Sequence, residues 1–116
     1  MDKKAGPVIA AMLEQVEAIE AWTQGKSFDD FCAERLLRQA VQRAIEIISE
    51  ASRRLRDDLK AQHPEINWEA VRSIGNVLRL EYENVQDEAI WLVVTDHIAP
   101  LKTALLGMKG QLNRCL

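Results

Sequence analysis

The stretch from Asn67 to Val85, NWEAVRSIGNVLRLEYENV, decides the fold. Apolar side chains recur in it at spacings of three and four, at Val71, Ile74, Leu78, Tyr82 and Val85. This spacing predicts one helix with an apolar stripe that packs on a core. Asn67 can cap the first turn, and Glu69 places a negative charge where the helix dipole favours it.

Two more apolar residues of this helix lie away from the stripe. Leu80 is nearly opposite Leu78 when successive residues turn by about 100°, and Val77 also lies off the stripe. An apolar patch on an outward helix face commonly marks a surface for a partner. We therefore predict a homodimer whose interface includes Val77 and Leu80.

Several segments of the chain match one known family in order and spacing. They are HPEI at 63–66, SFDDF at 27–31, AVQRAIEIISEA at 40–51, and the positions Trp68, Asn76, Leu78 and Tyr82. From about Ser27 to Leu105 the chain resembles, without gaps, the HepT-like family of the HEPN superfamily. The resemblance implies a helical, metal-independent ribonuclease that is the toxin of a toxin–antitoxin pair. It also implies a minimal nucleotidyltransferase antitoxin as partner, which attaches AMP to the tyrosine at position 82.

The family's signature is Arg, four residues, His, one residue, Tyr, and this chain departs from it. Gly75 stands at the Arg position and Leu80 at the His position, whereas Asn76 and Tyr82 are kept. Histidine suits proton transfer because its pKa lies near working pH, and arginine grips a phosphate with two hydrogen bonds. Gly75 and Leu80 can do neither, so we predict that any ribonuclease activity is impaired.

Neighbouring residues could restore only part of the chemistry. Arg72 and Arg79 flank position 75 at three and four residues, which makes them adjacent on a helix surface and candidate phosphate contacts. Nothing nearby replaces the histidine. The two histidines, His63 and His97, are not in a cluster with metal-ligand spacing, so neither a metal nor another cofactor is predicted. Glu46 and Glu50 are expected on a solvated helix face.

Two functions of different classes remain open at this stage. The first is a HepT-like toxin homologue, and the second is a non-enzymatic dimeric helical protein that binds a nucleotidyltransferase partner or a nucleotide. Tyr82 also allows two interpretations. Its ring either continues the apolar stripe into the core, or its phenol is exposed to receive AMP.

Composition bounds the class of protein. The 116 residues predict one domain, 1–116, and the formal net charge is −3. Proteins that grip phosphates usually carry a basic surface, so RNA binding is expected to be weak. Cys32 and Cys115 make no disulfide framework. No apolar run approaches the roughly 18 residues of a membrane span, and the N-terminus lacks a signal-peptide core, so we expect no membrane partner and a cytoplasmic protein.

The remaining periodic segments predict three more helices, at about 7–23, at about 32–62, and from a cap at Asp87 onward. Pro100 predicts a kink or short break between Asp96 and Pro100. Together the segments predict an all-α protein, an antiparallel up-and-down bundle of four main helices. A short extra helical turn at 27–31 is expected, with Ser27 as its cap and Asp30 completing a capping box. Trp22 is expected to anchor the core or its edge.

Overall fold

The computed structural model describes residues 5–80 and 83–114, without the side chains of residues 77, 79, 80, 83–85 and 114. The described residues form helices and turns and contain no strand, which confirms the predicted all-α class. The elements are α1 (Ala5–Thr23), α2 (Phe28–Ala33), α3 (Arg35–Ser52), α4 (Asp57–Ala61), α5 (Trp68–Leu80), α6 (Glu83–Leu92), the π-helical segment η1 (Val93–His97) and α7 (Ile98–Arg114).

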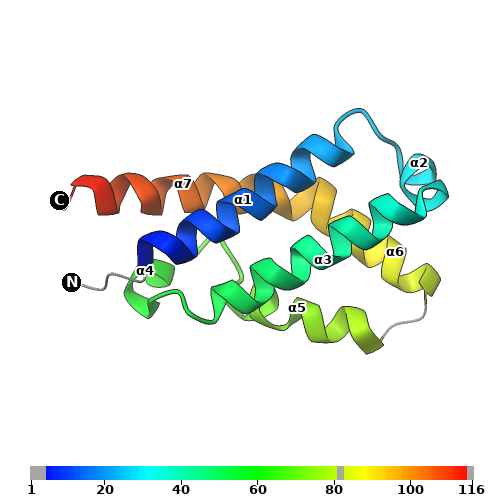
Figure 1. Cartoon of the computed structure of the whole chain (residues 1–116). Coiled ribbons are helices and arrows are strands. Elements are labelled where there is room, and N and C mark those ends of the chain that lie inside the picture. The colour runs from blue at the N-terminus through cyan, green and yellow to red at the C-terminus, as the bar shows by residue number, and fades with distance from the viewer. Residues whose placement is uncertain (1–4, 81–82, 115–116) are drawn as a thin grey trace.

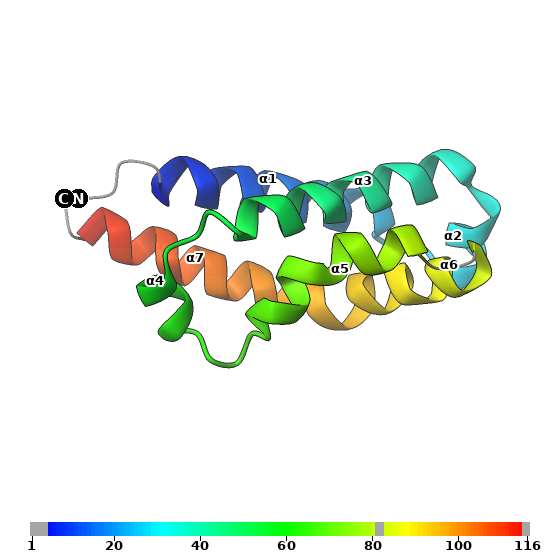
Figure 2. The same ribbon diagram turned by 90° about the horizontal axis from the view of Figure 1, so that it is seen from below.

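Long helices lie side by side in an elongated molecule of 46 × 28 × 22 Å (Figures 1 and 2). α1 packs against both α3 and α7, and α3 packs against α5 on its other side. α6, η1 and α7 follow one another without a loop as one helical rod that bends between α6 and α7 (Figure 2). This arrangement is compatible with the predicted helical bundle.

The core lies where α1, α3 and α7 meet. Its largest fully buried side chains include Ile9, Met12 and Ile19 from α1, Val41 and Ile45 from α3, and Leu105 and Met108 from α7. Burying one such side chain contributes about 1.5–3 kcal/mol. Phe31 of α2 adds a ring contact with Trp91, with centroids 5.2 Å apart. Apolar burial therefore fixes the positions of α1, α3 and the rod.

The long helix predicted over 32–62 is wrong in its extent. α3 ends at Ser52, whose hydroxyl donates to the Ser49 carbonyl at 2.7 Å, a local bond that competes with the helix. The chain turns and restarts as α4, with Asp57 and Asp58 in the first turn, where the dipole favours them. Leu55 and Leu59 are nevertheless buried, so the apolar stripe is used without a continuous helix.

The short helix α2 confirms the capping box. The Ser27 hydroxyl accepts from the Asp30 amide at 3.1 Å, and the Asp30 carboxylate accepts from the Ser27 amide at 3.0 Å. The hydrogen bond that the Ser27 amide donates to the carboxylate holds the pKa of Asp30 below its usual range. The expected core role of Trp22 is wrong, because 42% of its surface is exposed. It faces outward because the buried side of α1 passes through Ile19 and Thr23.

Asp87 does not cap a helix, contrary to prediction. α6 begins at Glu83, so Asp87 lies inside it, and its carboxylate pairs with the Arg38 guanidinium of α3 at 3.6 Å. The predicted kink or short break between Asp96 and Pro100 takes the form of a kink a few residues earlier and not of a break. The helix continues through the π-helical turn Val93–His97, where the Ile98 amide donates to the Val93 carbonyl and the helix axis bends (Figure 1). One extra residue in a turn relieves the clash that a proline ring makes with the preceding turn.

The rod is more apolar than its neighbours. Residues Gln86–Asn113 form a 28-residue helix that is long and apolar enough to cross a membrane, by length and composition only. Core helices of bundles pass the same test, and Ile90, Ile98 and Leu101 are buried here. Only 28% of the rod's most apolar window is buried, however. The rod therefore leaves apolar surface uncovered by this chain.

Trp68 ties the loop between α4 and α5 to the molecule. Its indole Nε1 donates to the carbonyl oxygens of Lys60 at 3.0 Å and His63 at 3.1 Å. The ring is half-buried and packs against the core. These two bonds hold the loop against the start of α5, which Asn67 caps by accepting from the Ala70 amide at 3.1 Å.

We predict that Trp68→Phe lowers the free energy of unfolding by about 1 kcal/mol, because the ring still packs while two carbonyls lose their donor. Urea unfolding followed by circular dichroism measures the change. Trp22→Phe is the matched control, since Trp22 is exposed and makes no hydrogen bond through its side chain to the described residues. Equal effects of the two substitutions would contradict the role given to the Trp68 bond.

Candidate functional site

A polar pocket of about 210 Å³ lies where α5 crosses α3. Its lining residues are Arg43, Glu46, Ser49, Glu50, Arg53, Gly75 and Asn76. It therefore contains Gly75, which stands at the Arg position of the family signature, and Asn76, which follows that position and is kept. Gly75 is buried and Asn76 is exposed.

α3 and α5 approach each other closely at Gly75. A Cβ at position 75 would lie 3.4 Å from the Ser49 Oγ and 3.6 Å from the Ser49 Cβ. The Ser49 hydroxyl donates to the Arg72 carbonyl at 2.7 Å, and the Arg53 guanidinium donates to the same oxygen at 3.3 Å. Two donors from α3 thus fix the register of α5 at the signature position.

The charges around this pocket nearly balance. Arg43 pairs with Glu46 at 3.6 Å, and Arg54 pairs with Glu50 at 3.8 Å. Glu50 is solvated as expected, whereas the Glu46 side chain is only 17% exposed, because α5 covers it. A phosphate placed here would meet two carboxylates as well as two guanidinium groups. Coulomb attraction to an anion is therefore largely cancelled.

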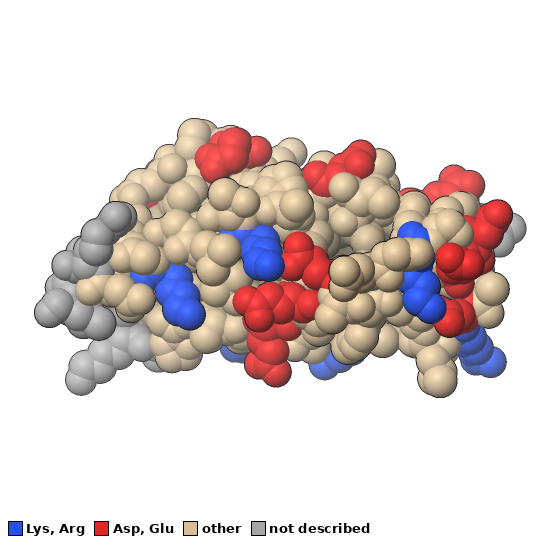
Figure 3. Space-filling model, turned by 90° about the horizontal axis from the view of Figure 1, so that it is seen from above, with Lys and Arg blue, Asp and Glu red and all other residues tan. Residues whose placement is uncertain are grey.

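The charged surface shows the same mixture. On the face drawn in Figure 3, basic side chains alternate with acidic ones and do not join into one patch. Elsewhere on the surface, Arg56 and Asp58 neutralise each other as an ion pair 2.8 Å apart. The described part of this face thus offers no extended basic surface to a nucleic-acid backbone.

Arg72 does not line the pocket, although it is three residues from Gly75. Its guanidinium donates to the Glu69 carboxylate at 2.6 Å on the exposed side of α5. That hydrogen bond raises the pKa of Arg72 and lowers the pKa of Glu69. The phosphate contact by Arg72 therefore stays a prediction, and it would lie on the exposed side of α5, outside the polar pocket.

The arginines that do lie beside Gly75 come from α3. Sequence reasoning missed Arg43 and Arg53 because they are more than twenty residues away along the chain. The spacing of the charged residues on α3, at positions 43, 46, 50 and 53, could have indicated that they act together. Steps of three and four place them on one helix face. What faces that stripe depends on the crossing with α5, which only the fold reveals.

Four predicted site residues cannot be placed. Val77, Arg79 and Leu80 belong to α5, but their side chains lie outside the described residues. Tyr82 lies wholly outside them. The interface at Val77 and Leu80, the phosphate contact by Arg79 and the exposure of Tyr82 therefore stay predictions. Within the described ranges, no group of three His, Cys, Asp or Glu could hold a metal ion.

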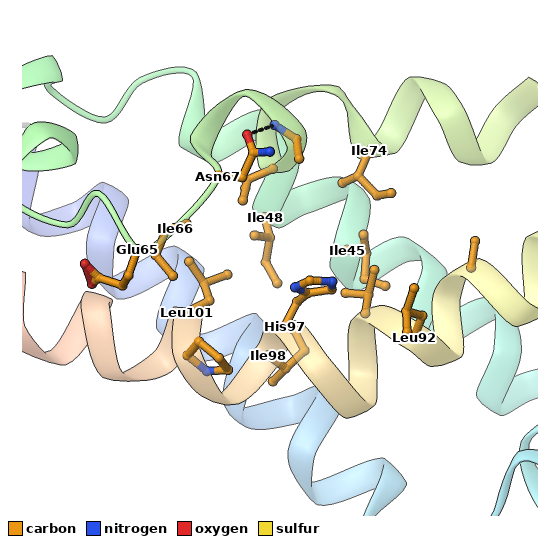
Figure 4. Close-up of a pocket in the computed structure, with 15 residues that line it drawn as sticks. Ile45, Ile48, Glu65, Ile66, Asn67, Ile74, Leu92, His97, Ile98 and Leu101 are labelled. Atoms are coloured by element: carbon orange, nitrogen blue, oxygen red, sulfur yellow. Dashed lines mark hydrogen bonds between the residues drawn. The ribbon is translucent and has the colours of Figure 1, made fainter.

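A larger hollow, the apolar groove, separates α5 from the rod (Figure 4). Its volume is about 510 Å³, and Ile45 and Ile48 of α3 line it together with Val71 and Ile74 of α5. The rod contributes Leu92, Val93, His97, Ile98, Pro100 and Leu101. Figure 4 shows the His97 ring in the middle of the groove and Glu65 toward one end. The groove thus lies on a different side of α5 from the polar pocket.

We predict that Gly75→Ala raises the free energy of unfolding by about 0.5–1 kcal/mol. Alanine is favoured over glycine inside a helix by about 1 kcal/mol, and a Cβ 3.4 Å from the Ser49 Oγ makes ordinary contact. Gly107→Ala should gain less or lose stability, because its Cβ would lie 3.2 Å from the His63 Cε1. Gly110→Ala is the control, with nothing within 4 Å. Urea unfolding compares the three, and a loss above 1 kcal/mol for Gly75→Ala would mean that the crossing excludes a methyl group.

Comparison with known proteins places the chain in a family. The family model described as Ribonuclease HepT-like matches residues 12–107. The chain is 37% identical over 89 residues to the "Probable ribonuclease HepT" of Thermococcus cleftensis, covering 77% of this chain and 81% of that protein.

A second relative combines a similar segment with another activity in its name. The chain is 33% identical over 103 residues to the "Gamma-glutamylcyclotransferase and putative RNase" of Methanocaldococcus jannaschii, covering 89% of this chain. It spans about half of that relative, 46% of its length. No solved structure matches the chain. The match of the family model over most of the sequence, with the all-helical fold, shows that the chain belongs to the HepT-like ribonuclease family.

Proposed function

We propose that this chain is a HepT-like toxin–antitoxin component whose ribonuclease chemistry is impaired. The observation that carries the proposal is the polar pocket at Gly75. The signature requires a guanidinium on this residue, and the backbone of Gly75 instead packs against Ser49. The imidazole that the signature requires five residues later is replaced by an isobutyl group at Leu80.

Cleaving RNA without a metal needs a base for the 2′-hydroxyl, an acid for the leaving oxygen and a cation for the transition state. Arg43 and Arg53 could supply positive charge at the pocket. Among the residues that the structure describes, no histidine lines the pocket. His97 lies in the apolar groove, and His63 lies against Gly107 on α7, its Nδ1 3.4 Å from the Glu65 carboxylate. Loss of proton transfer alone costs about 10²–10⁴-fold in rate.

The partners follow from the same family membership. We infer an antiparallel bundle that forms a homodimer through the α5 face bearing Val77 and Leu80, in the cytoplasm. Positions 75 and 80 differ by about 140° around a helix, so one helix cannot aim both at one atom. A two-fold dimer brings two copies of the helix together, so that residues from both copies can face one site. A minimal nucleotidyltransferase antitoxin that adds AMP to Tyr82 completes the proposed pair.

The alternative is a non-enzymatic dimeric helical protein that binds a nucleotidyltransferase partner or a nucleotide. The balanced charge of the polar pocket favours it over a tight RNA binder. In that case the α5 scaffold is kept for its partner surfaces and not for hydrolysis.

We predict little or no ribonuclease activity for the wild-type chain, and a gain of activity for the double variant Gly75→Arg, Leu80→His. The variant restores the cation and the proton carrier to the signature positions, and the pocket beside position 75 offers about 210 Å³. Fluorogenic RNA cleavage measures both proteins, with Gly75→Arg alone as control because it restores the charge without the imidazole. Wild-type cleavage as fast as that of the double variant would refute the impairment.

The second prediction of this proposal concerns Tyr82. Co-expression with a cognate minimal nucleotidyltransferase, in the presence of ATP and Mg²⁺, should add one AMP to the phenol. In-line transfer requires that oxygen to be reachable by the α-phosphate. Mass spectrometry of the peptide containing residue 82 detects the adduct, with Tyr82→Phe as control. An unmodified wild-type peptide would favour the alternative function.

A further inference from the structure

Glu46 is a covered carboxylate beside position 75. Its side chain is only 17% exposed, whereas the side chain of Glu50, in the same polar pocket, is 62% exposed. The three heavy atoms nearest to a Cβ at position 75 belong to Ser49 and Glu46, and the Glu46 Cα is one of them, at 3.9 Å. A side chain at position 75 would therefore leave α5 between Ser49 and Glu46.

A carboxylate at this place works against the binding of phosphate. Like charges repel, and the repulsion is stronger where protein covers the charge than where water does. The polar pocket is lined by two guanidinium groups, from Arg43 and Arg53, and by two carboxylates, so its charges sum to zero. A pocket that served only to attract phosphate would bind it better without Glu46. The presence of Glu46 therefore needs an explanation other than attraction of the substrate.

The present partners of Glu46 orient its carboxylate without saturating it. Its Oε1 lies 3.6 Å from the Arg43 Nη1, and the Gln42 Nε2 donates to its Oε2 at 3.4 Å. Both distances are long compared with the roughly 2.7–2.9 Å of a strong charge-assisted hydrogen bond. The Arg43 side chain is also 67% exposed, so most of its guanidinium faces water. The carboxylate thus has capacity for a closer cation.

We propose that Glu46 is a positioning residue of the HepT-like site, whose carboxylate holds the guanidinium of an arginine at position 75. The proposal rests on the proposed function, in which Gly75 has removed that guanidinium. Arginine pairs with a carboxylate in one plane through two hydrogen bonds, so the pair fixes the direction in which the guanidinium faces a phosphate. In this chain, Glu46 pairs with Arg43 instead.

The charge and the volume of the pocket agree with this role. An arginine at position 75 would give the lining three cations and two anions, and hence one net positive charge for the phosphate. The pocket offers about 210 Å³, and the closest contact of the new Cβ, 3.4 Å to the Ser49 Oγ, is an ordinary one. Glu46 is thus a retained part of a site that has lost the side chain it would orient.

Exchange of the arginine Nε proton with water, followed by NMR, tests the contact without requiring activity. In the full-chain variant Gly75→Arg, the new Nε–H should exchange roughly 10-fold more slowly than that of the exposed Arg54, because a hydrogen bond to a charged group protects the proton. Adding Glu46→Gln should remove this protection, and adding Glu50→Gln should keep it. Circular dichroism checks the fold. If helix content falls, Ser49→Ala is added to every variant, since the Ser49 Oγ is the atom nearest to the new Cβ.

Cleavage kinetics test the role in the restored site. In the double variant Gly75→Arg, Leu80→His, adding Glu46→Gln should lower kcat by roughly 10- to 100-fold with little change in KM, because a small misplacement of a reacting group has an effect of this size. Electrostatics alone predicts the opposite sign, since loss of a negative charge favours an anionic substrate. Glu46→Asp keeps the charge and should retain part of the rate. Glu50→Gln makes the same charge change on the solvated side and should raise the rate.

The two measurements separate this proposal from the one on which it rests. Wild-type cleavage as fast as that of the double variant refutes the impairment, while the exchange measurement still decides the role of Glu46. The exchange measurement also decides if the double variant is inactive. A new Nε–H that exchanges equally fast with and without Glu46→Gln overturns the proposal and leaves the impairment standing. Equal losses of kcat for Glu46→Gln and Glu50→Gln overturn it as well, because they would reflect a general effect of charge.

Discussion

The hydrogen bond from the Ser49 hydroxyl to the Arg72 carbonyl is the contact on which the site depends. The bond is 2.7 Å long and lies one turn from Gly75, where α3 and α5 are close enough for a Cβ to contact Ser49. Drawn toward α3 at this point, α5 covers Glu46 and closes the polar pocket. Its other side faces the rod without reaching it along the whole length, which leaves the apolar groove. One close crossing thus accounts for a polar hollow and an apolar one.

A feature of this structure can be predicted from the sequence when the residues that determine it lie close together in the chain. The stripe through Ile9, Val16 and Ile19 predicts α1 well, because the residues that form that helix also mark its buried face. The end of α3 at Ser52 has no proline or glycine to announce it. The helix ends where the Ser52 hydroxyl bonds to the preceding turn, and α4 begins at the acidic pair Asp57 and Asp58. Both are weaker signals in the sequence than the apolar periodicity, which continues without interruption.

The surroundings of the candidate site are harder to predict from the sequence than the helices are. Gly75 and Asn76 could be singled out through the family signature, but their surroundings could not. Arg43 and Arg53 reach the pocket only because α3 and α5 cross, and Asp87 leaves its expected capping role for a pair with Arg38, 49 residues away along the chain. Pairings of this kind depend on tertiary packing, which no local spacing encodes. A side chain's partner is thus harder to predict than its helix.

Gly75 and Ile74 connect the two hollows through one rigid helix. Successive residues turn by about 100°, so Ile74 lines the groove while Gly75 faces α3. The polar pocket and the apolar groove thus lie on two sides of the same helix. A shift of α5 toward α3 would narrow the pocket and widen the groove together. The helix keeps its apolar stripe at Val71, Ile74 and Leu78, although Gly75 and Leu80 depart from the signature. Packing of α5 depends on that stripe and on the backbone, whereas the chemistry of the signature depends on the side chains at positions 75 and 80.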